Sequence, residues 1–223
     1  MSTRFRVVLL HPGIDLAQAG GFAQNWQEWF TGPTGMRRLA LFGLACAAVL
    51  IVVLVANWLA VGFAFMVNDV EDAPDDALTP AKARRNPVSS GDLSPRFAWL
   101  ASLAVAGLAA ILYASLGVGP FVAGIACLVL AYLYSHRGVR LKATPYADLA
   151  SHALLLAGLQ FLAAYLSFNG GSVPQWVSPL ILVLAISLYG QLFNELRDLE
   201  GDRKAGVTHT ASVLGPRTAH WLM

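Results

Sequence analysis

The amino-acid sequence predicts an all-α fold, a polytopic bundle of transmembrane helices. Hydrophobic residues make up 57% of its 223 positions and charged residues only 13%, whereas a soluble domain carries about 25% charged residues. Several runs are apolar enough to cross a bilayer, which takes about 17–25 residues. Charged residues gather between these runs. The composition therefore disfavours a soluble globular domain, and we expect an integral membrane protein.

Five apolar runs each predict one membrane-spanning helix. They cover residues 39–67, 97–117, 119–135, 150–168 and 176–196. The first run is longer than one crossing needs, so we expect it to tilt or to extend beyond the hydrocarbon. Turns rich in Gly and Pro, at 117–120 and 169–174, join antiparallel neighbours. The last residues, 218–223, predict the start of a further helix.

The N-terminal residues predict a separate segment. Residues 1–35 read as irregular or interfacial, and residues 36–223 as the transmembrane domain. Aromatic side chains recur at helical spacing at Phe22, Trp26, Trp29 and Phe30. This pattern indicates a short helix that lies on the membrane surface and does not cross it.

Basic residues predict the orientation of the helices. They concentrate in three connections, 68–96, 136–149 and 197–217, and are absent from the turns near 118 and 169–175. By the positive-inside rule the three basic connections face the cytoplasm, which favours the plasma or inner membrane. The net charge of +2, without a basic stripe, gives no indication of nucleic acid binding.

A polar pattern occurs twice, each time directly after an apolar run. Residues 68–76 read NDVEDAPDD and residues 194–202 read NELRDLEGD. Each copy places one Asn and two Asp at intervals of four, at Asn68, Asp72, Asp76, Asn194, Asp198 and Asp202. Residues four apart stay on one face of a helix, so each copy presents three oxygen-bearing side chains together. Both copies are expected on the same side of the membrane.

These side chains predict a divalent-cation site. Carboxylate and amide oxygens are the ligands that Mg²⁺ prefers, and Mg²⁺ typically bridges to substrate phosphates. No His or Cys stands near either copy at the spacing of a zinc site. Pro74 and Gly201 interrupt the two copies, so we expect the helices to end near Asp72 and Asp198. Asp76 and Asp202 would then lie on the turns beyond.

Cations on the same side of the membrane could complement a diphosphate. The candidates are Arg84, Arg85, Arg140, Lys142, Arg203 and Lys204. Arg140 and Lys142 are favoured because they share a short connection; topology or lipid headgroup contact is the alternative for each cation. Four polar residues in or near spans either contact an acceptor or form interhelical hydrogen bonds: His152, Gln160, Asn169 and Gln191.

Three segments together resemble the UbiA superfamily of intramembrane prenyltransferases. NDVEDAPDD, followed by NPVSSG, resembles the first Asp-rich motif of that family, and NELRDLEGDRKAGVTHTASVLG is similar to the second. Between them, YSHRGVRLKATPYADLASHA is similar to the connection that lies between the motifs in the family. The resemblance covers about residues 40–217, in the expected order.

The resemblance implies nine helices around a cavity, in which both motifs bind Mg²⁺ and the diphosphate of a polyprenyl donor. The prenyl group would pass to a hydrophobic acceptor: an aromatic ring, a quinone precursor, a lipid or another isoprenoid. The resemblance assigns one metal to Asn68, Asp72 and Asp76 and the other to Asn194, Asp198 and Asp202. It assigns the diphosphate to Tyr134, Arg140 and Lys142. Asp72, Asp198 and Lys142 are the expected catalytic residues. Asn86 stands before Pro87 where the family usually has Arg, so Arg85 is a candidate substitute.

Two other classes of function remain open at this point. Five predicted spans are fewer than nine, so the resemblance implies a truncated chain, and an inactive protein or a scaffold with cation-binding acidic loops is the alternative. A membrane alcohol phosphotransferase also uses acidic residues and Mg²⁺. That class carries a D-G-x-x-A-R stretch, which this sequence lacks.

Overall fold

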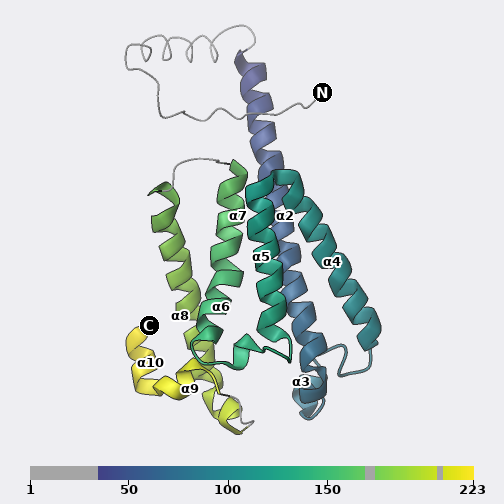
Figure 1. Cartoon of the computed structure of the whole chain (residues 1–223), viewed down its shortest axis with the longest axis vertical. Coiled ribbons are helices and arrows are strands. Elements are labelled where there is room, and N and C mark those ends of the chain that lie inside the picture. Colours follow the sequence, from purple (N-terminus) through teal and green to yellow (C-terminus); the bar gives the residue numbers. More distant parts are fainter. Residues whose placement is uncertain (1–34, 169–173, 205–207) are drawn as a thin grey trace. The chain divides into compact units, whose positions relative to one another are not determined.

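The computed structural model describes residues 35–168, 174–204 and 208–223, and these residues form helices and no strands (Figure 1). The α-helices are α2 (Gly35–Asp76), α3 (Pro80–Ala83), α4 (Pro95–Leu116), α5 (Val118–Ser135), α6 (Ala147–Ala153), α7 (Leu159–Phe168), α8 (Pro174–Lys204), α9 (Thr210–Leu214) and α10 (Pro216–Leu222). A 3₁₀ turn, η1 (Leu141–Ala143), precedes α6, and a π-helix, η2 (Leu154–Gly158), joins α6 to α7. The all-α prediction is confirmed. The aromatic segment at 22–30 lies outside the described residues.

Five helices of the described chain are long and apolar enough to cross a membrane. They are α2, α4, α5, the continuous run from α6 to α7, and α8, and each contains one of the five apolar runs. The helix predicted at 218–223 is present as part of α10.

The helices that carry the motifs extend further than the sequence predicts. α2 continues through Pro74 to Asp76, and α8 continues through Gly201 to Lys204. The prediction that they end near Asp72 and Asp198 was therefore wrong. Proline in a last turn costs one hydrogen bond and leaves the rest of the helix intact. Helical hydrogen bonding continues beyond Pro74, because Ala77 N donates to Ala73 O at 3.0 Å.

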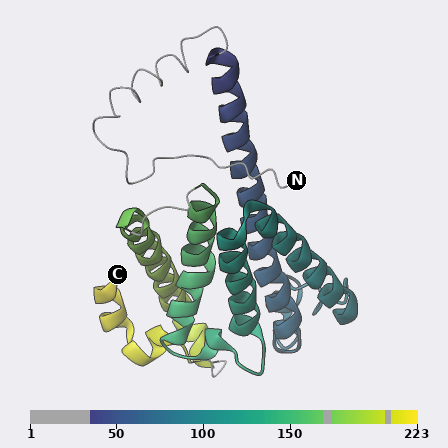
Figure 2. The ribbon, with the colours of Figure 1, turned by 45° about the horizontal axis from the view of Figure 1, so that its top comes forward.

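The chain divides into residues 1–50 and residues 51–223, and the helix bundle belongs to the second unit. One face of α2 enters its core with Ala56, Ala60, Phe63 and Val67, at helical spacing. Small residues of the other helices meet this face, at Ala109, Ala123, Cys127, Ala131 and Ala163. Small side chains let apolar helices approach closely, which is how helices associate where lipid removes the hydrophobic driving force. Figure 2 shows α4, α5 and α7 as neighbours in this unit.

A buried polar contact fixes the register of α2, α4 and α5. Tyr113 of α4 is fully buried and its hydroxyl donates to Asn57 Oδ1 of α2 at 2.8 Å. Its ring lies directly against Gly124 of α5, where no side chain intervenes. Gln160, for which the sequence left two roles open, donates to Leu155 O at 3.0 Å in the same helical run, so this bond is not the interhelical one expected.

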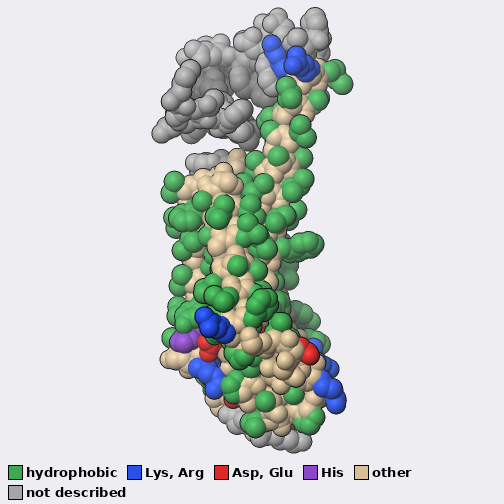
Figure 3. Space-filling model, turned by 90° about the vertical axis from the view of Figure 1, so that its right-hand side faces the viewer, with side chains coloured by type: hydrophobic (Ala, Val, Ile, Leu, Met, Phe, Trp, Pro, Cys, Tyr) green, Lys and Arg blue, Asp and Glu red, His purple; other side chains and the backbone are tan. Residues whose placement is uncertain are grey.

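Short segments gather at one end of residues 51–223. α3 lies there at the end of α2, and α9 and α10 lie beside α8 (Figure 1); η1 contacts α5 and α6. Hydrophobic side chains cover the long helices on the face that Figure 3 shows, and acidic and basic ones gather at this end. The connection from α5 to α6 contains two non-glycine residues with positive φ, Arg140 at 48° and Tyr146 at 67°. Each such conformation costs about 1–3 kcal/mol and persists only where surrounding contacts hold it.

Candidate active site

A cavity of about 790 Å³ opens at this polar end, and residues of both repeated motifs line it. The first motif contributes Asn68, Asp72, Asp75 and Asp76, and the second contributes Asn194, Glu195 and Asp198. The remaining lining residues are Leu78, Thr79, Lys82, Tyr134, Arg140, Lys142, Ala143, Gln191, Thr208 and His209. The structure thus brings together two segments that are more than a hundred residues apart in the sequence.

Two cations in the connection between α5 and α6 contact side chains of the first motif. Lys142 Nζ donates to Asn68 Oδ1 at 2.7 Å and also to Asp72 Oδ2. Arg140 lies 3.4 Å from Asp72 Oδ1 and donates to Asp75 Oδ2 at 2.9 Å. Burial of the Lys142 ammonium lowers its pKa, and the Asp72 carboxylate beside it opposes that shift. Both cations favoured from the sequence therefore reach the cavity.

Two acids of the first motif that are not members of the repeated pattern bind residues of this connection. Arg137 pairs with Asp75 at 3.1 Å. Glu71 Oε2 accepts the backbone N–H of Arg137 at 3.0 Å, and Glu71 Oε1 lies 3.1 Å from His136 Nδ1. The acids between the repeated positions thus compensate nearby basic groups.

Asn86 holds the end of the first motif. It is buried, and its Nδ2 donates to Asp69 O at 2.8 Å and to Asp76 Oδ2 at 3.0 Å. Its Oδ1 accepts the backbone N–H groups of Val88 and Ser89, at 2.9 and 3.2 Å. The residue that departs from the family pattern therefore orients an Asp of the motif through a neutral amide.

Replacing Asn86 by Ala is expected to destabilise the chain by about 1–3 kcal/mol, because buried partners lose their hydrogen bonds. The backbone oxygen of Asp69 and the N–H of Val88 are the groups affected. Thermal unfolding of the purified chain in detergent measures the effect, with Ser90→Ala, an exposed position in the same loop, as the control. Equal melting midpoints for the two variants would refute this role.

The second motif presents its side chains differently. Asn194 and Asp198 are exposed in α8 and line the cavity. Arg197 pairs with Asp198 through two contacts of 2.9 Å. Glu195 is buried, and its carboxylate accepts the backbone N–H of Ala211 at 2.9 Å. Both acids line the cavity, but Asp198 is exposed and Glu195 is buried.

Not every cation expected at the site lines the cavity. Arg85 and Arg203 are exposed and are not among the described residues that line the cavity. The side chains of Asp202 and Lys204 lie outside the described part of the structure, as does Asn169. His152 lies 3.4 Å from Ser187 of α8, which fits the interhelical alternative.

Sequence reasoning missed Lys82, Thr208 and His209 as lining residues. Lys82 belongs to α3, a one-turn helix that begins with Pro80 after Thr79. Pro at the first helical position was the available signal for this turn. His209 lies 3.4 Å from Glu195 and has no counterpart in the repeated pattern, so no sequence signal indicated it.

The oxygen donors in the cavity fit Mg²⁺. Asn68, Asp72, Asp76, Asn194 and Asp198 offer amide and carboxylate oxygens to one space. Among the described residues, no three acids, His or Cys are close enough to hold a metal ion by themselves. Mg²⁺ usually binds through one or two carboxylates and completes its shell with water and substrate phosphates. Carboxylates spread around a cavity are compatible with an ion bound in this way.

Comparison with known proteins identifies the family. The model of the UbiA prenyltransferase family matches residues 31–223. Lycopene elongase/hydratase of Haloarcula japonica is 32% identical over 168 residues, which is 72% of this chain and 55% of that protein. Digeranylgeranylglyceryl phosphate synthase of Methanoregula boonei is 32% identical over 160 residues, 68% of this chain and 52% of that protein. Probable homogentisate phytyltransferase 2 of Oryza sativa subsp. japonica is 29% identical, over 72% of this chain and 44% of that protein.

The fold is also similar to a solved structure. A UbiA homolog from Archaeoglobus fulgidus bound to GPP and Mg²⁺ superposes with a TM-score of 0.67 and 28% sequence identity. The match covers 77% of this chain and 60% of that one. The chain spans about half the length of the relatives that it matches. By the family match over residues 31–223 and the shared fold, this integral membrane protein belongs to the UbiA prenyltransferase family.

Proposed function

We propose that this chain carries the prenyl diphosphate site of a Mg²⁺-dependent membrane prenyltransferase. The observation that carries the proposal is the single cavity lined by both motifs together with Lys82, Arg140 and Lys142. The similar Archaeoglobus fulgidus structures, bound to GPP or DMAPP and Mg²⁺, support the same class of donor. The acceptor would be a hydrophobic molecule: an aromatic ring, a quinone precursor, a lipid or another isoprenoid.

The reaction would break the bond between the allylic carbon of the donor and its diphosphate oxygen. The electron pair leaves with the diphosphate, the allylic carbocation bonds to the acceptor, and the acceptor loses a proton. Mg²⁺, held by the repeated Asn and Asp side chains, would supply Lewis-acid stabilisation of the leaving diphosphate. Arg140 and Lys142 would hold its remaining oxygens, because preorganised cations stabilise charge that develops on a leaving group.

Lys82 adds a third cation to the lining of the cavity. No ion pair of Lys82 is present among the described residues, whereas Arg140 and Lys142 both pair with acids of the first motif. Its positive charge would therefore be available to an anion without first breaking a pair. We assign Lys82 to diphosphate binding in place of Arg85, which the cavity lining does not include.

The site would face the cytoplasm. The connections that contain Lys82, Arg140 and Lys142 hold most of the basic residues when the connection at 197–217 is counted with them, and the positive-inside rule places such connections on the cytoplasmic side. The bundle beneath is apolar, so a prenyl chain that enters it from the cavity would be kept from water. Excluding water protects a carbocation from hydrolysis.

The function is tested in membranes that contain the full chain. Radiolabelled geranyl diphosphate is supplied with Mg²⁺ and one acceptor of each class. We expect a labelled lipid-soluble product that disappears with EDTA and returns when Mg²⁺ is restored. A chain that neither binds nor transfers the label under these conditions would be a scaffold, and the proposal would be wrong.

Replacing Lys82 by Met is expected to raise the KM for geranyl diphosphate about ten-fold, because a charge-assisted contact is lost. Arg84→Met is the matched control, an exposed cation two residues away that does not line the cavity. Arg85→Met tests the assignment made from the sequence. An increase in KM with Arg85→Met and none with Lys82→Met would reverse our assignment.

A further inference from the structure

Hydrogen bonds at both ends of the connection at 136–146, together with the chain between them, join the two motif helices. Its first part is on α2, where Glu71 accepts the Arg137 backbone N–H at 3.0 Å and lies 3.1 Å from His136 Nδ1. Arg137 Nε also donates to the backbone oxygen of Glu71 at 2.8 Å. The start of the connection is therefore held on the helix of the first motif.

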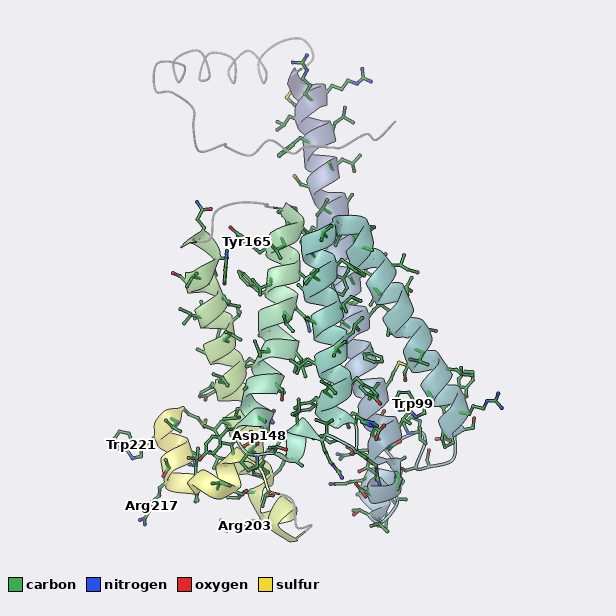
Figure 4. The ribbon with its side chains drawn as sticks, in the orientation of Figure 1. Trp99, Asp148, Tyr165, Arg203, Arg217 and Trp221 are labelled. Atoms are coloured by element: carbon green, nitrogen blue, oxygen red, sulfur yellow. The ribbon has the colours of Figure 1, made fainter. Side chains whose placement is uncertain are left out.

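The end of the connection is held by Thr210. The Tyr146 N–H donates to Thr210 Oγ1 at 2.6 Å. The Thr210 N–H donates to Asp148 Oδ2 at 2.7 Å, and its hydroxyl donates to Asp148 Oδ1. Thr210 and Asp148 are completely buried. Figure 4 shows Asp148 inside this end of the bundle, whereas Arg217 and Trp221 project from α10 away from it.

The segment that contains Thr210 is tied in turn to α8. Glu195 Oε2 accepts the N–H of Ala211, the next residue, at 2.9 Å. Glu195 Oε1 accepts from Gln191 Nε2 at 3.1 Å, which fixes the carboxylate on its own helix. Two buried carboxylates from different helices thus bind two consecutive N–H groups.

Arg140 and Lys142 lie between these two anchored ends. Arg140 and Tyr146 have φ angles of 48° and 67°, which a non-glycine residue keeps only when contacts outside the connection hold it. The hydrogen bonds of Glu71 and Thr210 are such contacts. If either end were released, the two cations would be held only by their own contacts with Asn68, Asp72 and Asp75.

We infer that Thr210, held by Asp148 and next to the anchor of Glu195, is a positioning residue that places Arg140 and Lys142 for the reaction. Thr210 is not among the described residues that line the cavity, so it acts through the connection and not by touching a substrate. The effect of Thr210 on the reaction rests on the proposed function, whereas its effect on the position of the connection rests on the hydrogen bonds alone. It also explains Glu71 and Glu195, acids of the motifs that are not in the repeated pattern.

The experiment compares Thr210→Val with Thr210→Ser in the full chain. Val keeps the volume and removes the hydroxyl, whereas Ser keeps the hydroxyl. Ser102→Ala is the matched control, because it deletes a completely buried hydroxyl that donates to Ala98 O at 2.8 Å, within α4. Hydrogen exchange of a peptide covering residues 138–148 should become about ten-fold faster in Thr210→Val and stay unchanged in the other two. Unchanged exchange in Thr210→Val, or an equal increase in Ser102→Ala, would overturn the inference.

Kinetics then test the consequence. Thr210→Val should lower kcat for transfer from geranyl diphosphate by about ten-fold and raise the Mg²⁺ concentration needed for half activity, because the cations are misplaced. Thr210→Ser should restore both values to within about two-fold. An active Thr210→Val chain with unaltered kcat would overturn the positioning role. If the wild-type chain transfers no prenyl group but residues 138–148 still exchange faster in Thr210→Val than in the wild type, the proposed function is refuted. The link between the helices is then still supported.

Discussion

Replacing Asp198 by Asn is expected to lower the rate of prenyl transfer by about 10²–10³-fold, the usual cost of losing one group that stabilises charge in the transition state. Asp198 is exposed in α8 and lines the cavity together with residues of the first motif. The substitution keeps the size of the side chain and removes its negative charge. Asp72→Asn should have an effect of similar size, since both carboxylates would serve one diphosphate.

Initial rates with radiolabelled geranyl diphosphate at saturating Mg²⁺ measure this effect. Asp92→Asn is the control, because Asp92 is an exposed acid of the loop before α4 and does not line the cavity. The double variant, Asp72→Asn with Asp198→Asn, should be little slower than either single variant, because groups that act as one unit are not additive. A rate for Asp198→Asn equal to that of Asp92→Asn would remove the second motif from the site.

Replacing Gly124 by Ala is expected to prevent stable folding or to cost about 1–3 kcal/mol or more, as overpacked cores do. A Cβ at Gly124 would overlap the Tyr113 ring, at 2.6 Å from Cε2 and closer still to Cγ and Cδ2. Tyr113 cannot move away easily, because it is completely buried and its hydroxyl is bonded to Asn57. The change therefore separates α4 from α5.

Thermal unfolding in detergent, followed by size-exclusion chromatography, checks this result. Gly107→Ala is the matched control in α4, where a Cβ meets nothing within 4 Å. Ala is favoured over Gly in a helix interior by about 0.5–1 kcal/mol, so the control should be as stable as the wild type or more stable. If Gly124→Ala melted at the same temperature as Gly107→Ala, the close packing of α4 on α5 would be wrong.

Length and composition were sufficient to predict the five long helices. Each apolar run had to form a helix if it was to satisfy its backbone groups in lipid, so the runs specified the spans without any tertiary information. The interval of four likewise specified the arrangement of the motif side chains without tertiary information. It predicted that Asn68, Asp72 and Asp76 share a face, and all three line the cavity.

The ends of the motif helices could not be predicted from Pro74 and Gly201 alone. A local preference at a helix end is small compared with tertiary contacts that extend the helix. Here Asn86, ten residues beyond Asp76, bonds both to that side chain and to the backbone of Asp69. This contact depends on how the loop returns, and sequence spacing does not contain that information.

The different roles of the acids could not be predicted from the sequence for the same reason. The repeated pattern selected Asp198 and left Glu195 without a role, yet Glu195 is buried and binds the N–H of Ala211, while Asp198 is exposed. Lys82 belongs to α3 and lines the cavity, whereas Arg85 lies in the turn after α3 and does not. Burial and direction follow from the fold, so the sequence could supply the set of acids and cations but not the role of each.

Equilibrium binding of radiolabelled geranyl thiodiphosphate, which is not cleaved, tests most directly whether the two motifs share one diphosphate. The wild-type chain in detergent should bind one molecule per chain in the presence of Mg²⁺ and none after EDTA. Asp72→Ala and Asp198→Ala should each weaken this binding by about ten-fold or more, since each removes a group that would hold the metal and its diphosphate. Tight Mg²⁺-dependent binding in either variant, equal to that of the wild type, would contradict a site shared by both helices.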